Sequence, residues 1–341
     1  ASGGVLTRVL MHLLETGRIN AAVVVQQGFP IPEQARVRIA RSRQEILDAA
    51  GSVYIPVSTL DILSRLEPGG RYAMTCLPDQ AAALRRLQQA GYPPAQQVVH
   101  VLGPYTGTAL RPAAIRSFLQ ARGVGPEDRV TRLQWRAGEW PGYLEIKTAG
   151  GRVFRARKFY YNYLIPFFIT QASLQSTDFT NEFCDLSAGD AWSPRFEALG
   201  GGFSVVTTRS AEMEAVVMEM VTGGLLKLAE EDPLESLSMH GHMLDFKKRG
   251  SYIRNRIRRF FGLKAPDYGL KPEPLPLMRV AVECVIVVIF ALAGTRVARA
   301  LVRRIPESVI GPAFDRLRRA WKALSKPAKR KGLRNIRMRP A

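Results

Sequence analysis

The chain has 341 residues, of which 46% are hydrophobic and 23% are charged, and its formal net charge is +20. These proportions are those of a globular protein, and they exclude a disordered, collagen-like or coiled-coil chain. The cysteines Cys76, Cys184 and Cys284 lie far apart, which excludes a disulfide scaffold, a zinc ribbon and a four-thiolate cluster held by this chain alone. Because the first residue is Ala1 and not Met, we expect a processed or truncated start.

Helical and strand-like patterns alternate from the beginning of the chain. Apolar residues recur at helical spacing from Val5 to Leu14, and Gly17 ends that helix. Strands are predicted at residues 21–25, 72–76 and 98–102, a strand or extended run at 52–55, and helices at residues 43–50, 80–90 and 113–121. Strands that alternate with helices in this way are typical of an α/β fold.

Residues 130–156 break this alternation. Their strand-like runs, around Trp135, at 143–147 and at 153–154, predict a small antiparallel insert. A strand at 203–208 and a helix at 211–228 follow. The predicted fold class is therefore α/β, with a mixed sheet, flanking helices and the antiparallel insert, followed by a basic, membrane-associating helical tail.

The excess positive charge is confined to the end of the chain. Residues 1–246 contain 24 Lys and Arg and 24 Asp and Glu, whereas residues 247–341 contain 25 and 5, a net of +20. A neutral body with a basic tail indicates that the tail binds something anionic, either a membrane surface or nucleic acid. We favour the membrane because an apolar run lies within the basic region.

That apolar run extends from Leu275 to Gly294. At ~1.5 Å per residue it is about long enough to cross a bilayer, but Arg279 and Glu283 lie in its first half, four residues apart, where they can pair on one helix face. A transmembrane helix, an interfacial helix and a buried core helix all remain open. The predicted organisation is a body at 1–246, a basic proline-containing linker at 247–274, the candidate membrane helix at 275–295 and a basic helical tail at 296–341.

One motif at the start of the first helix has the residue types of a phosphate site. It consists of Ser2, Gly3, Gly4 and Thr7. Glycines let a phosphate approach the backbone, and a helix N-terminus offers N–H groups and the positive end of the helix dipole. A serine N-cap followed by glycines has the same pattern without binding anything.

Two further motifs carry polar side chains. Gly189 and Asp190 are interpreted as a tight turn with a carboxylate at its tip, which suits either a binding loop or a structural Asx-turn. His240 and His242 are spaced to share a metal ion, but no third ligand is apparent, and a solvated turn is the simpler interpretation.

Several segments, taken in order, suggest one protein family. They are residues 1–7 with 13–17, 51–54, 78–87, 177–182, 185–192 and 208–209. Together they resemble the beta-subunit family of coenzyme F-420 hydrogenase/dehydrogenase, over roughly residues 1–228. The resemblance implies an α/β flavoprotein that holds FAD, usually with a 4Fe–4S cluster, and that exchanges electrons with a deazaflavin, ferredoxin or related substrate. It implies that Ser2, Gly3, Gly4 and Thr7 hold the FAD phosphates and that Gly189 and Asp190 belong to the cofactor site.

The sequence departs from this family at the cluster ligands. Asp79, Tyr105, Ser173 and Ser176 stand where the resemblance places cysteines. Hydroxyl and carboxylate groups are poor substitutes for the soft thiolates that an iron–sulfur cluster needs, and Cys76 alone cannot hold one. We therefore expect FAD as the cofactor and no 4Fe–4S cluster in this chain.

The sequence thus predicts a FAD-dependent oxidoreductase with a cytoplasmic body, tethered to an anionic membrane by its C-terminal tail. Its redox partner would be an electron carrier of the deazaflavin or ferredoxin type, and no catalytic acid or base can be named. The alternative is a non-catalytic, cluster-less scaffold or binding subunit of the same fold, whose flavin content would distinguish it. Nucleic acid is the least favoured partner.

Overall fold

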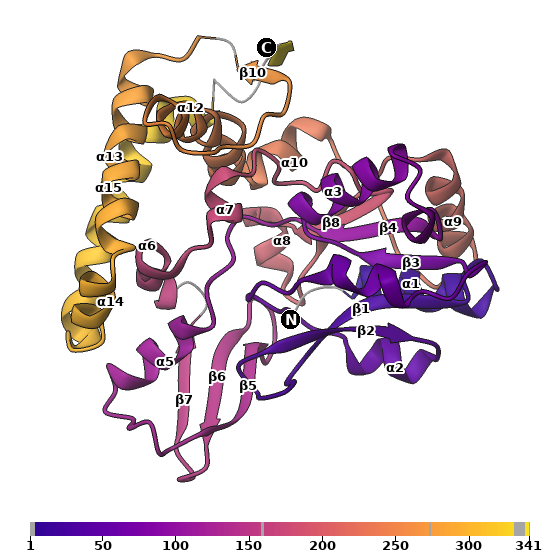
Figure 1. Ribbon diagram of the computed structural model, residues 1–341, viewed down its shortest axis with the longest axis horizontal. Helices are drawn as coiled ribbons and strands as arrows, with labels where there is room; N and C mark the ends of the chain where they lie inside the picture. The colour runs from indigo at the N-terminus through magenta and orange to yellow at the C-terminus, as the bar shows by residue number, and fades with distance from the viewer. Residues whose placement is uncertain (1–3, 158–159, 273, 331–337, 341) are drawn as a thin grey trace. The chain divides into compact units, whose positions relative to one another are not determined.

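The computed structural model describes residues 4–157, 160–272, 274–330 and 338–340 (Figure 1). The strands are β1 Ala21–Gln27, β2 Ala35–Ala40, β3 Tyr72–Thr75, β4 Val98–Pro104, β5 Val130–Ala137, β6 Tyr143–Thr148, β7 Val153–Arg157, β8 Leu186–Asp190, β9 Ser204–Thr208, β10 Leu270–Pro272 and β11 Met338–Pro340. The α-helices are α1 Val5–Glu15, α2 Arg43–Asp48, α3 Pro78–Gln89, α4 Pro93–Gln96, α5 Ala113–Gln120, α6 Ile165–Phe168, α7 Gln171–Gln175, α8 Pro194–Leu199, α9 Ala211–Thr222, α10 Pro233–Met239, α11 Gly241–Asp245, α12 Tyr252–Phe260, α13 Leu277–Ala293, α14 Arg296–Val302 and α15 Glu307–Arg330. Two 3₁₀ helices, η1 Thr59–Arg65 and η2 Tyr160–Leu164, and a π-helix, η3 Phe246–Ser251, complete the described elements.

The chain divides into two compact units. The first unit contains residues 1–106, 131–146 and 180–232, and the second contains residues 107–130, 147–179 and 233–341. Each unit is therefore assembled from segments that lie far apart in the sequence. The predicted domain boundaries at 246, 274 and 295 remain predictions, since the division into units follows other positions.

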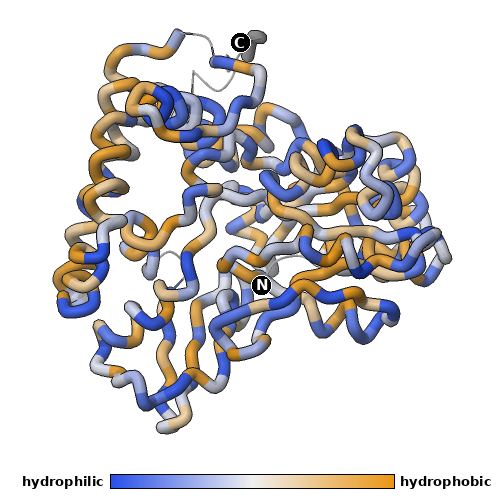
Figure 2. Tube along the Cα trace, viewed as in Figure 1, coloured by the Kyte–Doolittle hydropathy of each residue, from blue (hydrophilic) through white to orange (hydrophobic). Residues whose placement is uncertain are grey.

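A six-stranded sheet forms the centre of the first unit, with the strand order β2-β1-β3-β4-β8-β9. Strands β1, β3, β4 and β8 are parallel, and β2 and β9 pair antiparallel at the two edges. Buried parallel strands have apolar residues on both faces, which explains the continuous apolar run of β1 (Figure 2). The mixed α/β fold predicted from the alternation of helices and strands is confirmed.

Helices cover both faces of this sheet. Helices α1, α2 and α9 pack on one face, where Leu13 and Met213 are fully buried against the strands. Elements η1, α3 and α4 pack on the other face, where Ile62 and Leu84 are buried. The spacing of Val9, Leu10 and Leu13 on α1 gives that helix the apolar face which this packing needs.

The structure differs from the sequence prediction at Gly189 and Asp190. They lie in strand β8, where Gly189 pairs with Val205 and Asp190 with Ser204, and not at the tip of a tight turn. The partner strand β9 follows only after the α8 segment. The residues next to Gly189 in the sequence therefore give no sign of the strand pairing.

The second unit is mainly helical. Its core includes Ile169, Leu174 and Phe246, packed against partly buried residues that include Phe290 of α13. Residues 246–260 are helical, and the prolines of the predicted linker, Pro266, Pro272 and Pro274, all come after that helical segment. A separate three-stranded sheet is formed by β5, β6 and β7 at the place where the insert was predicted, and β5 and most of β6 are counted in the first unit.

The apolar run predicted at 275–294 forms helix α13. Within the described residues, no single helix is both long and apolar enough to span a membrane. Helices α13 and α14 are long and apolar enough to span a membrane only when they are taken together, and the pair is bent by 79°. The structure therefore leaves the predicted membrane association of the tail unconfirmed.

Candidate functional site

The carboxyl ends of the parallel strands in the first unit lie at one edge of the sheet, where open α/β sheets bind their ligands. Cys76 directly follows β3, Tyr105 directly follows β4, and Asp190 is the last residue of β8. Helix α1 is joined to β1 by the short turn at 16–20, so it runs back along the sheet and begins at this same edge. The fold thus brings together residues that the sequence analysis proposed separately.

Helix α1 begins at Val5, and its N-cap is Gly4, whose φ of +73° is accessible to glycine and strained for other residues. Gly4 is exposed and has no side chain with which to cap the helix, and the first turn contains no acidic residue. Thr7 lies in the first turn of the helix and is half-buried. Ser2 and Gly3, the other two predicted phosphate contacts, lie outside the described residues.

The ring of Tyr105 packs so closely on Gly189 that the position has no room for a side chain. A Cβ atom at Gly189 would lie 2.3 Å from Cδ2 of Tyr105, too close for any other residue to fit without displacing that ring. The Tyr105 hydroxyl lies 2.6 Å from Oγ1 of Thr207, so the ring is held at both ends. Burial raises the pKa of Tyr105, and the phenol therefore stays protonated at neutral pH.

Asp190 forms a buried ion pair with Arg136 of β5. Nη1 of Arg136 lies 2.8 Å from Oδ2 and 3.1 Å from Oδ1 of Asp190, and the two side chains are 5% and 10% exposed. A charge pair removed from water in this way costs solvation energy, so its geometry has to be well satisfied. The predicted carboxylate thus fixes the orientation of a guanidinium group that sequence reasoning missed.

Two pairs of aromatic rings lie in the same unit, and Tyr54 is close enough to Arg136 and Asp190 for their charges to act on it. The rings of Tyr54 and Trp135 meet edge to face at 5.6 Å between centroids, and the rings of Trp140 and Trp192 lie 4.8 Å apart. Burial raises the pKa of Tyr54 more than the nearby Arg136 lowers it, so the phenol remains a neutral hydrogen-bond donor. Planar faces around a few oriented polar groups are typical of sites for flat heterocyclic ligands.

The position of Asp79 offers no place for a metal ligand set. Asp79 is exposed in the first turn of α3, whose start is fixed by Gln80, which accepts a hydrogen bond from Leu77 N at 2.9 Å. Cys76 is buried, and burial raises the pKa of its thiol to about 12, so the thiolate that binds iron is disfavoured. The backbone oxygen of Cys76 instead accepts a hydrogen bond from Asn181 at 2.7 Å.

Ser173 and Ser176 lie in the second unit, at helix α7. The Ser173 hydroxyl accepts hydrogen bonds from Ala109 N at 2.8 Å and from the Thr170 hydroxyl at 2.9 Å. Ser173 and Ser176 are both buried, and both present oxygen where iron prefers sulfur. Among the described residues, no three His, Cys, Asp or Glu side chains gather as a metal site.

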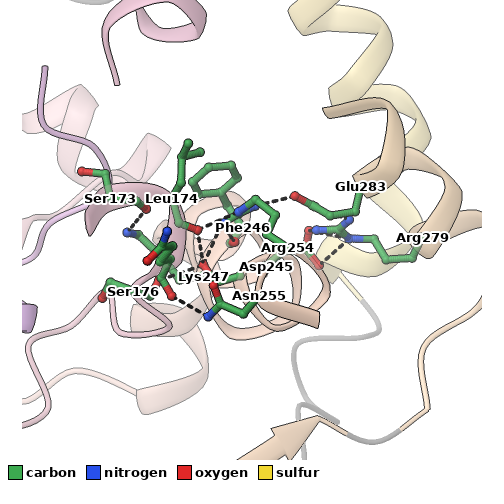
Figure 3. A network of polar contacts seen from close by, with 12 residues as sticks. Ser173, Leu174, Ser176, Asp245, Phe246, Lys247, Arg254, Asn255, Arg279 and Glu283 are labelled. Atoms are coloured by element: carbon green, nitrogen blue, oxygen red, sulfur yellow. Dashed lines mark hydrogen bonds and ion pairs between the residues drawn. The ribbon is translucent and has the colours of Figure 1, made fainter. Parts of the chain in front are cut away.

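The carbonyl groups of residues 173–176 are all held by one helical segment, η3 with α12 (Figure 3). The donors are Lys247 Nζ to Ser173 at 2.6 Å, Arg254 Nε to Leu174 at 2.7 Å, Asn255 Nδ2 to Gln175 at 2.9 Å and Ser251 Oγ to Ser176 at 2.8 Å. We call these four donors the clamp. Because serine hydroxyls and a buried ammonium group occupy this segment, its residues do not fit an iron–sulfur cluster.

His240 is not in a solvated turn, which corrects the sequence interpretation. It is buried at the start of α11, and its ring lies 5.1 Å from the ring of Phe179. Because Phe179 is far from His240 in the sequence, the spacing of the two histidines gave no sign of this burial.

Two family models match consecutive parts of the chain. The N-terminal model of the coenzyme F420 hydrogenase/dehydrogenase beta subunit matches residues 1–64, and the C-terminal model matches residues 69–233. The chain belongs to this family. The matched residues include the carboxyl edge of the sheet, from Gly4 to Asp190, whereas the clamp and helices α11 to α15 lie beyond them.

Two known proteins are similar to this member of the family. A coenzyme F420-dependent sulfite reductase from Methanocaldococcus jannaschii is 24% identical over 265 residues, which are 72% of this chain and 39% of that protein. The chain therefore spans about two fifths of the length of this relative. A chain from the xenon-derivatised F420-reducing [NiFe] hydrogenase complex of Methanosarcina barkeri has a similar fold, with a TM-score of 0.60 at 20% identity over 78% of this chain and 90% of that one.

Proposed function

We propose that this chain is a FAD-dependent oxidoreductase subunit that transfers electrons between a soluble carrier and a partner or substrate at the membrane. The observation that carries the proposal is the family match, because it takes in the sheet and the whole carboxyl edge of the first unit. The names of the two similar proteins both refer to F420, which supports a deazaflavin as the carrier. A cytoplasmic body follows from the same proposal, since such carriers are soluble.

The residues at the carboxyl edge suit a dinucleotide with a flat ring system. The N-terminus of α1 at Gly4 would receive phosphate groups through its N–H groups and helix dipole, with Thr7 close by. Trp140 and Trp192 offer planar faces, and Asp190 holds the Arg136 guanidinium in one orientation. Flavin, when bound, supplies the two-electron chemistry, while these residues bind and orient it.

The test compares two glycines that flank helix α1, Gly4 before its N-terminus and Gly17 after its C-terminus. Gly4 and Gly17 are both exposed, both have a positive φ (+73° and +67°), and a Cβ atom added at either glycine would meet no other atom within 4 Å. Gly4→Val and Gly17→Val therefore introduce similar backbone strain. Only Gly4→Val places a branched side chain at the helix N-terminus.

We expect the full chain, with any natural sequence before Ala1, to take up FAD on reconstitution, as measured by absorbance and by quenching of flavin fluorescence. Gly4→Val should raise the dissociation constant about tenfold or more, whereas Gly17→Val should leave it within about twofold, since tenfold corresponds to ~1.4 kcal/mol of lost binding. Equal weakening by both variants would place the phosphates elsewhere. No flavin uptake by any of the proteins would end the enzyme proposal.

The second candidate is a non-catalytic scaffold subunit of the same fold. The clamp favours it, because the segment at 173–176 is fixed by hydrogen bonds from Lys247 and Arg254 and not by metal ligation. A purified chain that folds normally, binds no flavin and still associates with a redox partner would support this candidate.

A further inference from the structure

Helix α13 has its charged side chains inside the protein and its apolar side chains outside. Its charged residues, Arg279 and Glu283, are buried, with side chains 5% and 0% exposed. The exposed residues are Leu277, Met278, Ala281, Cys284, Val285, Val288, Ala291 and Leu292. A helix on the surface of a water-soluble protein has the opposite arrangement.

A network of ion pairs fixes this orientation. Glu283 is bonded through one oxygen to Arg254 and through the other to Nη1 of Arg279, at 2.6 Å in the latter case (Figure 3). Arg279 also lies 2.9 Å from Asp245, which itself pairs with Arg249 at 3.5 Å. Turning α13 about its axis would leave these charges buried without partners, which is strongly unfavourable. The inward face of α13 is therefore fixed.

The outward face of α13 forms one continuous apolar stripe. Its residues at 277, 281, 284, 288 and 291 follow each other at intervals of four and three, as required for a single helix face, and those at 278, 285 and 292 widen it. The helix has 17 residues, so at ~1.5 Å per residue the stripe is about 25 Å long. Beyond the bend, Val297 and Leu301 of α14 are also exposed. Exposed apolar surface of this extent marks a binding surface.

The charge around the stripe indicates what covers it. Residues 247–341 carry a net charge of +20, and exposed basic residues flank the stripe in sequence at Lys264, Lys271, Arg296 and Arg304. A second copy of the chain would bring the same positive charge against the first, whereas an anionic surface would neutralise it. Each basic residue near an anionic leaflet adds to the attraction.

We propose that α13 and α14 dock on an anionic lipid bilayer through this stripe, lying in the plane of the interface and not crossing the membrane. The ion pairs on the inward face keep one side of α13 against its own unit, which prevents lipid from surrounding the helix. The 79° bend between α13 and α14 also prevents the two from forming one straight span. The docking deepens the membrane part of the proposed function. It does not depend on flavin binding, so it can fail while the flavin-dependent activity still holds.

The test is sedimentation of the full-length protein with vesicles of phosphatidylcholine alone, or with about one third phosphatidylserine. The informative variant is Val288→Glu, and the matched control is Met218→Glu on α9, because both side chains are 55% exposed on a helix surface. Both variants should keep the circular dichroism spectrum and melting temperature of the parent. Val288→Glu loses the burial of a valine and brings a carboxylate against an anionic surface. We therefore expect it to weaken binding to anionic vesicles at least tenfold, and Met218→Glu to leave binding unchanged.

Five outcomes would overturn the proposal. One is no sedimentation with anionic vesicles, and another is binding that Val288→Glu does not weaken. A third is a stable dimer that Val288→Glu converts to monomer, which would assign the stripe to a second copy. The fourth is protein that stays in the membrane pellet in alkaline carbonate, which would indicate a true span. The fifth is tight binding to a DNA duplex without vesicle binding, which would assign the basic region to nucleic acid.

Discussion

The pair formed by Asp190 and Arg136 is a charge interaction at the candidate site in which both side chains are almost fully buried. Without this carboxylate, the buried guanidinium group would lose the two bonds that offset its removal from water. The neighbouring Tyr54 cannot replace the carboxylate, because burial keeps the pKa of its phenol raised and the group uncharged. The stability of the first unit should therefore depend on this one side chain.

We predict that Asp190→Asn lowers the free energy of unfolding by about 3–5 kcal/mol. The control is Glu67→Gln, which breaks the exposed pair between Arg41 and Glu67 and should cost less than about 1 kcal/mol. Urea unfolding followed by tryptophan fluorescence measures both, because Trp135, Trp140 and Trp192 lie in the same unit. Similar losses in the two variants would mean that the buried pair contributes no more than a surface pair.

At the scale of elements, the clamp and the ion pairs of α13 share one residue, Arg254. Its guanidinium donates to the carbonyls of Leu174 and Phe246, at 2.7 and 2.9 Å, and pairs with Glu283. One side chain therefore connects α7, η3, α12 and α13 within the second unit. This explains how the segment at 173–176 is held without thiolate ligands.

We predict that Arg254→Met lowers the free energy of unfolding by about 3–5 kcal/mol, since it leaves Glu283 and two carbonyl groups short of donors. Arg256→Met, on the exposed side of the same helix, should change it by less than about 0.5 kcal/mol. In the double variant Arg254→Met/Glu283→Met, the loss should be smaller than the sum of the single losses, because both single variants remove the same bond between Arg254 and Glu283. Additive losses, measured by urea unfolding, would show that the two side chains do not interact.

Local patterns predicted the elements that depend on local forces. The periods of residues 72–76, 80–90 and 98–102 led to β3, α3 and β4 within a few residues. Strand β2 was missed although Arg36 and Arg38 alternate with apolar residues, which is the pattern of a half-buried edge strand. Strand β8 was missed because its pairing with β9 depends on residues beyond α8.

The candidate site shows the same division between local and distant information. Asp190 was identified from its motif, but Arg136 is 54 residues away in sequence and has no motif of its own. The closeness of Trp135 and Trp140 in the sequence was a usable signal for an aromatic site. The pairing of Arg279 with Glu283 was predicted from their spacing and is confirmed, but the direction of that face depends on Asp245 and Arg254, some thirty residues upstream.

For the whole molecule, the chain combines a neutral region that the family models match with a basic region that lies beyond them. The three cysteines differ in which of these regions they belong to and in their exposure. Cys76 and Cys184 are buried in the first unit, whereas Cys284 is exposed within the apolar stripe of α13. Because Cys284 belongs to the proposed docking surface, its reactivity reports directly on what covers that surface.

We predict that one thiol of three reacts with a water-soluble disulfide reagent in the folded protein at pH 8, and that Cys284→Ser abolishes this reaction. Cys76 should stay silent, because burial raises the pKa of its thiol to about 12, so the reactive thiolate is scarce at every pH up to that value and the group is also shielded. Denaturation should expose all three thiols. Adding anionic vesicles should slow the labelling of Cys284 about tenfold or more, since a docked stripe excludes the reagent, while neutral vesicles should slow it much less because they lack the ~1 kcal/mol that each basic residue gains at an anionic leaflet. The protein could instead sediment with anionic vesicles while Cys284 remains fully reactive. That result would mean that the basic residues alone bind the protein to the membrane and that the stripe on α13 faces water.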